Sequence, residues 1–542
     1  MTAGVATGAA RPGLPVLIAC AAAPLACGAL SVWLGQDANW DLRNYHFYNP
    51  YALLHGRLGF DVAVAHQPTY YNPVSDLPFY FLATALPARA TGFALGVLHG
   101  LNFVLLLAIA WRLLATSAEA VRRWAAIALA ALGMTGAITL SELGTTFHDN
   151  FVSLFMLGGL LVLVLYYRHL VEAPLVRALA IAAASGLLAG LGVGLKQTAV
   201  IFAIGPCAAL LLVTTRLHRR FLLSFCFGLG VLVGIAATGG YWMVVLWQHY
   251  GNPLLPHYNH IFKSPWAVES DYVDRKYNPD SLIEALIYPI KLVYDPKRVA
   301  EVAFRDLRLP ILYVLSAAAL LAWPLRRRWI GPGHLAVADH HPGNLVLVAS
   351  GIAYLGWLAI SGVYRYLVPL EMLAPILIML VVDRLALPRW GHGTLLGAIL
   401  GASLAPLQPG DWGRAPWAVD YFGVAPPAIA SPARSIVLMT GLEPMAYVIP
   451  FFPPETPFLR IDGWFTGSPT NPHRHDHFMR QRIAVHGGPI YVLYRAPLEH
   501  ERMVKALTTH GLRPRLADCV SFKPHIDRAE GETLAFCPVD RL

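Results

Sequence analysis

The sequence predicts an all-α polytopic membrane protein that carries a small α/β domain at its C-terminal end. The first observation is composition: of 542 residues, 56% are hydrophobic and 13% are charged, and the mean hydropathy is +0.51. Soluble proteins carry about 25% charged residues. The second is a series of apolar runs long enough to cross a bilayer as helices. The third is a tail after residue 406 that is richer in charge.

The apolar runs predict about eleven membrane helices when they are read in windows of about 19 residues. The first run is too long for the apolar part of a signal peptide, so we interpret it as an uncleaved helix. Residues 76–91 cover about half a span and contain Pro78 and Pro87, so we expect an interfacial helix there. The predicted spans lie near residues 14–35, 92–112, 124–141, 151–167, 178–195, 198–215, 221–247, 310–325, 344–361, 366–383 and 393–406.

The distribution of arginine predicts how the chain is oriented. With the N-terminus in the cytoplasm, the inside segments hold many arginines and few acids, as the positive-inside rule requires. The net charge of +9 therefore reflects orientation in the bilayer, and we expect no nucleic-acid partner. We expect a multi-pass protein of the bacterial cytoplasmic (inner) membrane, with a cytoplasmic N-terminus and an extracytoplasmic C-terminus.

This orientation places three large segments outside, namely the loops 36–91 and 248–309 and the tail 407–542. We predict a transmembrane domain at residues 1–406, which includes both loops, and a soluble extracytoplasmic α/β domain at residues 407–542. In the tail, "SIVLMTG" and "PIYVLYR" are typical of strands, and "LEHERMVKALTTHG" has helical periodicity and ends at a glycine.

Cys519 and Cys537 are the only two cysteines of the tail. An oxidising compartment would let them pair. The segments around them, "ADCVSF" and "LAFCPV", are both typical of short strands, and neighbouring strands would bring the sulfurs together. We therefore predict a disulfide between these cysteines.

Four ionisable residues are predicted to meet at the outer face of the membrane. Asp41 follows the first span, Asp149 lies at the outer end of the fourth, Lys196 at that of the fifth, and Arg365 at that of the tenth. Ionisable groups at such positions are costly and usually functional. Taken alone, Asp41 could be a general base, a metal ligand or an interface residue, and either cation could be a headgroup anchor.

Together these residues favour the chemistry of a lipid phosphate. Lys196 and Arg365 would bind an anionic lipid phosphate, and Asp41 would deprotonate an acceptor hydroxyl. This combination describes sugar transfer from a lipid-phosphate donor. The chain contains no P-loop and no dinucleotide-binding glycine motif, so a nucleotide-driven pump is not indicated.

The order of these motifs resembles the GT-C superfamily of integral-membrane glycosyltransferases, which includes the protein mannosyltransferases and the aminoarabinose transferase of lipid A. Asp41, Tyr45 and Gly56 match the pattern of the first outer loop, and Asp149 and Lys196 match later positions. Leu42 stands where many members have a second acid. The resemblance covers about residues 14–405 and leaves out the tail.

The resemblance implies a GT-C-like fold and a polyprenyl-phosphate sugar as donor, with a glycan, lipid or protein as acceptor. It implies a hexosyl- or pentosyltransferase with Asp41 as the general base and Asp149 as a second catalytic acid. We expect the following residues to bind substrate: Lys196, Arg365, Tyr45, His46, His66, His148, His257 and Lys263.

Metal binding and transport are the alternatives. His257 and His260 have a spacing that can bind a metal, but no third ligand of firm spacing accompanies them. We therefore predict no metal ligand and no certain cofactor, while a divalent metal stays open. A secondary transporter or flippase for a lipid-linked or anionic substrate would place ionisable groups near the bilayer midplane and show repeated halves. The predicted helix interiors are nearly free of charge, the acids cluster in the outer loops and no halves repeat, which favours the enzyme.

Overall fold

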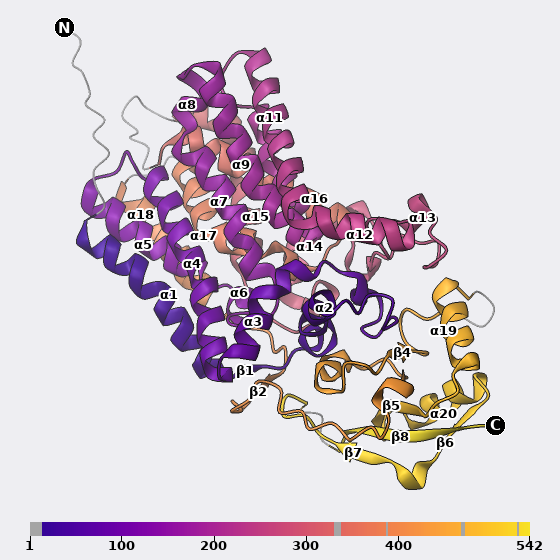
Figure 1. The fold of residues 1–542 in the computed structure, drawn as a ribbon. Coiled ribbons are helices and arrows are strands. Elements are labelled where there is room, and N and C mark those ends of the chain that lie inside the picture. The colour runs from indigo at the N-terminus through magenta and orange to yellow at the C-terminus, as the bar shows by residue number, and fades with distance from the viewer. Residues whose placement is uncertain (1–12, 330–337, 386–388, 468–471, 528–530) are drawn as a thin grey trace.

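The computed structural model describes residues 13–329, 338–385, 389–467, 472–527 and 531–542. A bundle of helices forms one part of the molecule, and a mixed β-sheet built by the C-terminal residues lies at one end of it (Figure 1). The first outer loop lies between the bundle and the sheet. The loop and the tail therefore lie at the same end of the bundle, where α1 (Leu14–Leu34) ends.

Each predicted span coincides with helical structure. Within the described ranges, six helices are long and apolar enough to cross a membrane, namely Leu14–Leu34, Ala88–Leu113, Leu175–Leu195, Leu217–Tyr250, His340–Ile360 and Tyr364–Leu385. Shorter apolar helices cover Asp149–Leu165, Gln197–Leu210, Arg308–Leu321 and Gly393–Leu404. The chain is thus a multi-pass membrane protein, and the number of about eleven spans stays a prediction.

The helices of the bundle have the following bounds: α4 Ala88–Leu113, α5 Glu119–Gly133, α6 Ala137–Ser141, α7 Asp149–Leu165, α8 Tyr167–Glu172, α9 Leu175–Leu195, α10 Ile201–Leu210, α11 Leu217–Ile235, α12 Tyr241–Tyr250, α15 Arg308–Trp329, α16 His340–Ile360, α17 Val368–Val382 and α18 Arg389–Leu404. The outer loops hold α2 (Tyr48–Leu54), α3 (Leu77–Ala85), α13 (Asn259–Phe262) and α14 (Leu282–Tyr294). With nine residues, α3 is too short to span, so the ambiguous stretch 76–91 does not cross the membrane as a single helix.

Two features organise the bundle. Helix α17 lies at its centre, since 94% of the residues in the apolar stretch within Tyr364–Leu385 are buried. Helices α9 and α11 pack side by side through glycines: a Cβ added at Gly186 or Gly190 would collide with the backbone of α11. Small residues at such crossings let two backbones approach closely, and in lipid this packing replaces the hydrophobic effect as the source of helix association.

The tail forms a six-stranded sheet with the order β4-β3-β5-β8-β6, and β7 also pairs with β8. Its strands are β3 (Ile436–Met439), β4 (Phe458–Arg460), β5 (Ile490–Ala496), β6 (Leu512–Pro514), β7 (Val520–Phe522) and β8 (Thr533–Arg541). Strand β3 runs parallel to β4 and β5, whereas β8 is antiparallel to its neighbours. Helices α19 (Arg474–Val485) and α20 (His500–Thr509) complete the predicted mixture of strands and helices.

The first outer loop and the tail share one hydrophobic core. Phe47 and Tyr48 of the loop pack in the same buried cluster as Tyr447 and Phe458 of the tail. Polar contacts reinforce this junction: β1 (Gln36–Asp37) pairs with β2 (Arg414–Ala415), and the carboxylate of Asp61 accepts a hydrogen bond of 2.8 Å from the backbone N–H of Phe458. The tail therefore fixes the loop that carries Asp41, although the domain boundary at residue 406 stays a prediction.

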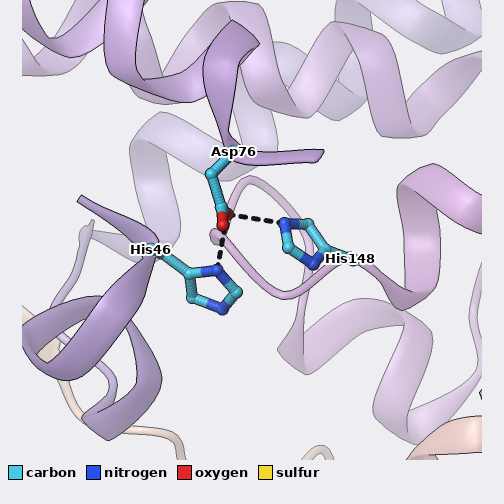
Figure 2. Close-up of side chains that lie close together, drawn as sticks. All are labelled: His46, Asp76 and His148. Atoms are coloured by element: carbon cyan, nitrogen blue, oxygen red, sulfur yellow. Dashed lines mark hydrogen bonds and ion pairs between the residues drawn. The ribbon is translucent and has the colours of Figure 1, made fainter. Parts of the chain in front are cut away.

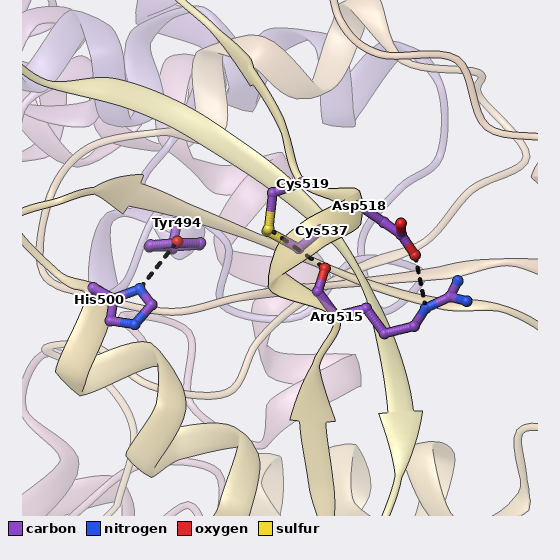
Figure 3. The surroundings of a disulfide bond; sticks show 6 residues. All are labelled: Tyr494, His500, Arg515, Asp518, Cys519 and Cys537. Carbon is purple, nitrogen blue, oxygen red and sulfur yellow. Dashed lines mark hydrogen bonds and ion pairs between the residues drawn. A yellow bond between two sulfur atoms is a disulfide. The ribbon is translucent and has the colours of Figure 1, made fainter.

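Cys519 and Cys537 form a disulfide within the sheet (Figure 3). Cys519 precedes β7 and Cys537 lies in β8, and these two strands pair antiparallel with Val520 opposite Phe536. Strand pairing thus sets the two sulfurs side by side, as the sequence predicts. Cys20, Cys27, Cys207 and Cys226 are free.

We expect the disulfide to stabilise the tail by ~3 kcal/mol, since cross-linking a loop of this size reduces the entropy of the unfolded chain. Thiol alkylation of denatured protein should label Cys519 and Cys537 only after reduction. The C519S/C537S double variant should unfold more easily than the wild type, whereas C226S should not. Labelling of both cysteines without reductant would contradict this prediction.

Candidate active site

Asp41 and Arg365 form an ion pair that joins the first outer loop to the turn before α17. Nη1 of Arg365 lies 3.2 Å from Oδ2 of Asp41, and both side chains are 15% exposed. The same guanidinium donates from Nε to Glu301, at 2.9 Å. Arg365 therefore bridges two carboxylates that lie far apart in the sequence.

Asp149 and Lys196 form a second ion pair beside the first. Nζ of Lys196 lies 2.5 Å from Oδ1 of Asp149, and the two side chains are 17% and 5% exposed. Both cations contact one aromatic ring, because Nζ of Lys196 lies 4.9 Å from the centroid of Tyr366 and Cζ of Arg365 lies 5.3 Å from it. These distances bound the separation of the two cations at about 10 Å. The four residues that the sequence predicts to meet thus lie in one cluster.

The local structure explains why these side chains reach the same place. Asp149 begins α7, where a carboxylate is stabilised by the helix dipole. Lys196 directly follows α9 with an extended backbone. Arg365 lies in a 3-10 turn, Tyr364–Leu367, that leads into α17. Helix ends at one level of the bundle therefore supply three of the four charges.

Two further carboxylates of the cluster are not among the residues singled out from the sequence. Glu301 lies in the second outer loop, and Glu142 lies in the turn before α7. Glu142 is fully buried, and its carboxylate oxygens have no hydrogen-bond partner within the described ranges. Burial, with the charge of Asp149 next, raises the pKa of Glu142 well above its usual value. A single acid in a loop carries no motif, so the sequence gives no signal for either residue.

Aromatic side chains form a wall next to the ion pairs. The rings of Tyr45 and Tyr71 meet edge to face with centroids 5.6 Å apart, and His257 stacks on Tyr71 at 5.5 Å. Burial, and then the charge of Asp41, raises the pKa of Tyr45 and of Tyr71, so both phenols stay neutral at physiological pH. Tyr45 also contacts the ring of His46 at 4.1 Å.

Two predicted substrate-binding residues make other contacts, and the ring of His66 also stacks on Trp40, the neighbour of Asp41, with centroids 6.3 Å apart. Nδ1 of His66 accepts a hydrogen bond of 3.0 Å from the backbone N–H of Trp464, so this side chain joins the outer loop to the tail. Lys263 is 72% exposed and lies 3.7 Å from Glu269. Neither contact directs the side chain at the ion pairs.

His46, Asp76 and His148 converge on one oxygen atom (Figure 2). Oδ1 of Asp76 lies 2.6 Å from Nδ1 of His46 and 2.7 Å from Nε2 of His148. Burial alone would raise the pKa of Asp76, but the two imidazoles hold that pKa below its usual value. Asp76 lies in a stretch of aromatic and apolar residues, so the sequence does not single it out as a functional residue.

A cavity of about 220 Å³ opens where the first outer loop meets the tail. Its lining includes two arginines, two glutamates and a tryptophan: Arg43, Arg495, Glu443, Glu532 and Trp412. Trp412 connects the cavity to the ion pairs, because its ring lies 4.7 Å from Phe147, and Phe147 lies 4.9 Å from Cζ of Arg365. The cavity is therefore two aromatic rings away from the Asp41–Arg365 pair.

Comparison with family models and with curated proteins finds no match. Among solved structures, the chain is similar to the oligosaccharyltransferase of Archaeoglobus fulgidus in its apo form, with 12% identity and a TM-score of 0.48 over 90% of this chain and 71% of that chain. The same enzyme tethered with an acceptor peptide gives 13% identity and a TM-score of 0.46 over 89% and 70% of the chains.

The chain is also similar to ArnT from Cupriavidus metallidurans bound to undecaprenyl phosphate. The identity is 12% and the TM-score is 0.39 over 96% of this chain and 97% of that chain.

The buried ion pair predicts a specific pattern of stability. K196M should lower the melting temperature of the detergent-solubilised protein, because it leaves the carboxylate of Asp149 buried without its partner, which costs roughly 3–5 kcal/mol. The double variant K196M/D149N removes both charges and should recover most of the loss. If the double variant is as unstable as K196M, Asp149 is not the partner that matters.

Proposed function

We propose that this chain transfers a sugar from a polyprenyl-phosphate donor to an acceptor hydroxyl at the outer face of a bacterial inner membrane. One observation carries the proposal: the carboxylate of Asp41 lies in the same cluster as Lys196 and Arg365, the two cations on the ring of Tyr366. A carboxylate base can deprotonate an acceptor hydroxyl, and two cations beside it can bind the phosphate of the donor.

In the proposed transfer, Asp41, Lys196 and Arg365 each have a defined role. Asp41 takes the proton of the acceptor hydroxyl as its oxygen attacks the anomeric carbon of the donor sugar. The bond between that carbon and the phosphate oxygen breaks, and the polyprenyl phosphate leaves with the bonding electron pair. Lys196 and Arg365 stabilise the negative charge that develops on the leaving phosphate. Atoms, electrons and protons balance without a co-reactant.

The acceptor would bind in the cavity between the first outer loop and the tail. Sugar hydroxyls donate to carboxylates such as Glu443 and accept from guanidinium groups such as Arg495, and the face of a ring stacks on an aromatic side chain. Arg43 is 16% exposed and pairs with Asp527 through one nitrogen. The lining therefore offers both donors and acceptors to a polyhydroxylated ligand.

Two observations support the outer face as the location of the reaction. The disulfide of the tail suits an oxidising compartment, and the tail packs against the first outer loop, which carries Asp41 of the ion pairs. The arginine-rich segments of the sequence favour the opposite end as cytoplasmic.

Glu371 is the observation that bears on the transport alternative, because it is a fully buried acid in the central helix α17. Its carboxylate accepts hydrogen bonds from the backbone N–H groups of Ile138 and Thr139, at 3.2 and 2.8 Å. It also accepts hydrogen bonds from the hydroxyls of Thr139 and Tyr364. Glu371 thus accepts hydrogen bonds from N–H groups in the first turn of α6. This structural role accounts for a buried acid in the central helix without a proton relay.

D41N should lower turnover by ~10²-fold or more, the loss typical of a missing general base, because the amide keeps the shape and cannot take a proton. The assay is sugar transfer by purified protein from a panel of polyprenyl-phosphate sugars. The matched control is D274N, which changes an exposed acid of the second outer loop. Near-wild-type turnover of D41N would make Asp149 or Asp37 the next candidate.

R365K should weaken use of the donor more than it changes the fold, because lysine keeps the charge but loses the fork that contacts two oxygen atoms. We expect a higher KM for the lipid-phosphate donor and an unchanged KM for the acceptor. R275K, at an exposed arginine, is the control. An unchanged donor KM in R365K would remove Arg365 from the phosphate site.

A further inference from the structure

We propose that His46, Asp76 and His148 bind one divalent transition-metal ion, and that zinc is the ion their ligand types favour. The proposal concerns a site that does not contain Asp41. It stands on the geometry of three side chains and does not depend on the proposed sugar transfer.

The three side chains present one ligand atom each, and all three atoms lie within 4.8 Å of one another. The imidazole planes of His46 and His148 are almost perpendicular, at 83°, with centroids 4.5 Å apart. This edge-to-face arrangement lets a nitrogen of each ring point at Asp76 without stacking (Figure 2).

The spacing needs only a small change to admit an ion. Ligand atoms of a tetrahedral zinc site lie about 3.3 Å apart when each bond is about 2.0 Å. The two contacts of Oδ1 of Asp76, at 2.6 and 2.7 Å, are somewhat shorter. A rotation of the carboxylate away from the two rings would therefore open the position of the ion.

The ligand set also identifies the kind of ion. Two imidazoles and one carboxylate form a set that zinc and neighbouring transition metals bind, whereas calcium and magnesium prefer oxygen ligands. Three protein ligands leave a fourth position for an oxygen ligand such as water.

The ion would join three segments of the chain. His46 ends the π-helical turn Leu42–His46 that follows Asp41, Asp76 ends the 3-10 turn Pro73–Asp76, and His148 precedes α7. His46 and Asp76 are almost fully buried, and His148 is 13% exposed. An ion at their meeting point would hold the outer loop against the bundle and fix the turn that carries Asp41.

A hydrogen-bonded cluster without an ion is the alternative. In that arrangement both imidazoles donate to Oδ1 of Asp76, and Nε2 of His46 is buried without a partner within the described residues. The metal site and the hydrogen-bonded cluster can be distinguished by measurement, because only the metal site gives a bound metal in the purified protein.

The test is the metal content of full-length protein, purified without chelators and with its affinity tag removed, by inductively coupled plasma mass spectrometry. We expect about one zinc per chain, and at least about tenfold weaker zinc binding in H46A, D76N and H148A. The matched control is H55A, an exposed histidine of the same outer loop, which should keep its metal.

Wild-type protein provides a second measurement in case the variants fail to fold. Chelation should remove the ion and lower the melting temperature, and added zinc should restore both. X-ray absorption of the zinc-loaded protein should show nitrogen and oxygen ligands at about 2.0–2.1 Å. Wild-type protein that neither contains zinc nor binds it on titration would overturn the proposal, and so would D76N and H46A variants that keep full occupancy.

Discussion

Pairing of charge at the helix ends that meet the first outer loop is the constraint on which the rest of the structure depends. Lys196 and Arg365 are largely buried, and a buried charge without a partner is strongly destabilising. Asp149 and Asp41 satisfy these two cations, and Glu301 adds a second carboxylate to Arg365. These five groups come from the first outer loop, the second outer loop and three helix ends, so the charges can pair only when all of these segments have come together.

The tail belongs to this arrangement because it holds the loop that carries Asp41. The regular elements of the loop are short, and its aromatic residues are buried against those of the tail. The ion pair of Arg57 and Asp61 ties the two parts, since Nη2 of Arg57 donates to the carbonyl of Thr456 while Asp61 accepts from Phe458. The tail thus acts on the position of the candidate base through the packing of the loop.

The sequence predicts the parts of this molecule that follow local rules. Apolar runs predict the helices, and cysteines on neighbouring strands predict the disulfide. Charges at the ends of apolar runs predict the cluster of Asp41, Asp149, Lys196 and Arg365. It misses Glu142, Glu301 and Asp76, because each is a single acid whose partners lie far away in the chain. The shared core of loop and tail is missed for the same reason, since a hydrophobic pattern shows that a residue is buried but not what covers it.

The ion pairs also explain how a base and a phosphate site can share one cluster. Without substrate, Arg365 binds the carboxylate of Asp41. A phosphate is a stronger ligand for a guanidinium fork than one carboxylate oxygen is. In the proposed transfer, arrival of the donor would therefore draw Arg365 toward the phosphate and leave the carboxylate of Asp41 without its partner. On this view the carboxylates stabilise the empty site, and the donor itself releases the base for the acceptor hydroxyl.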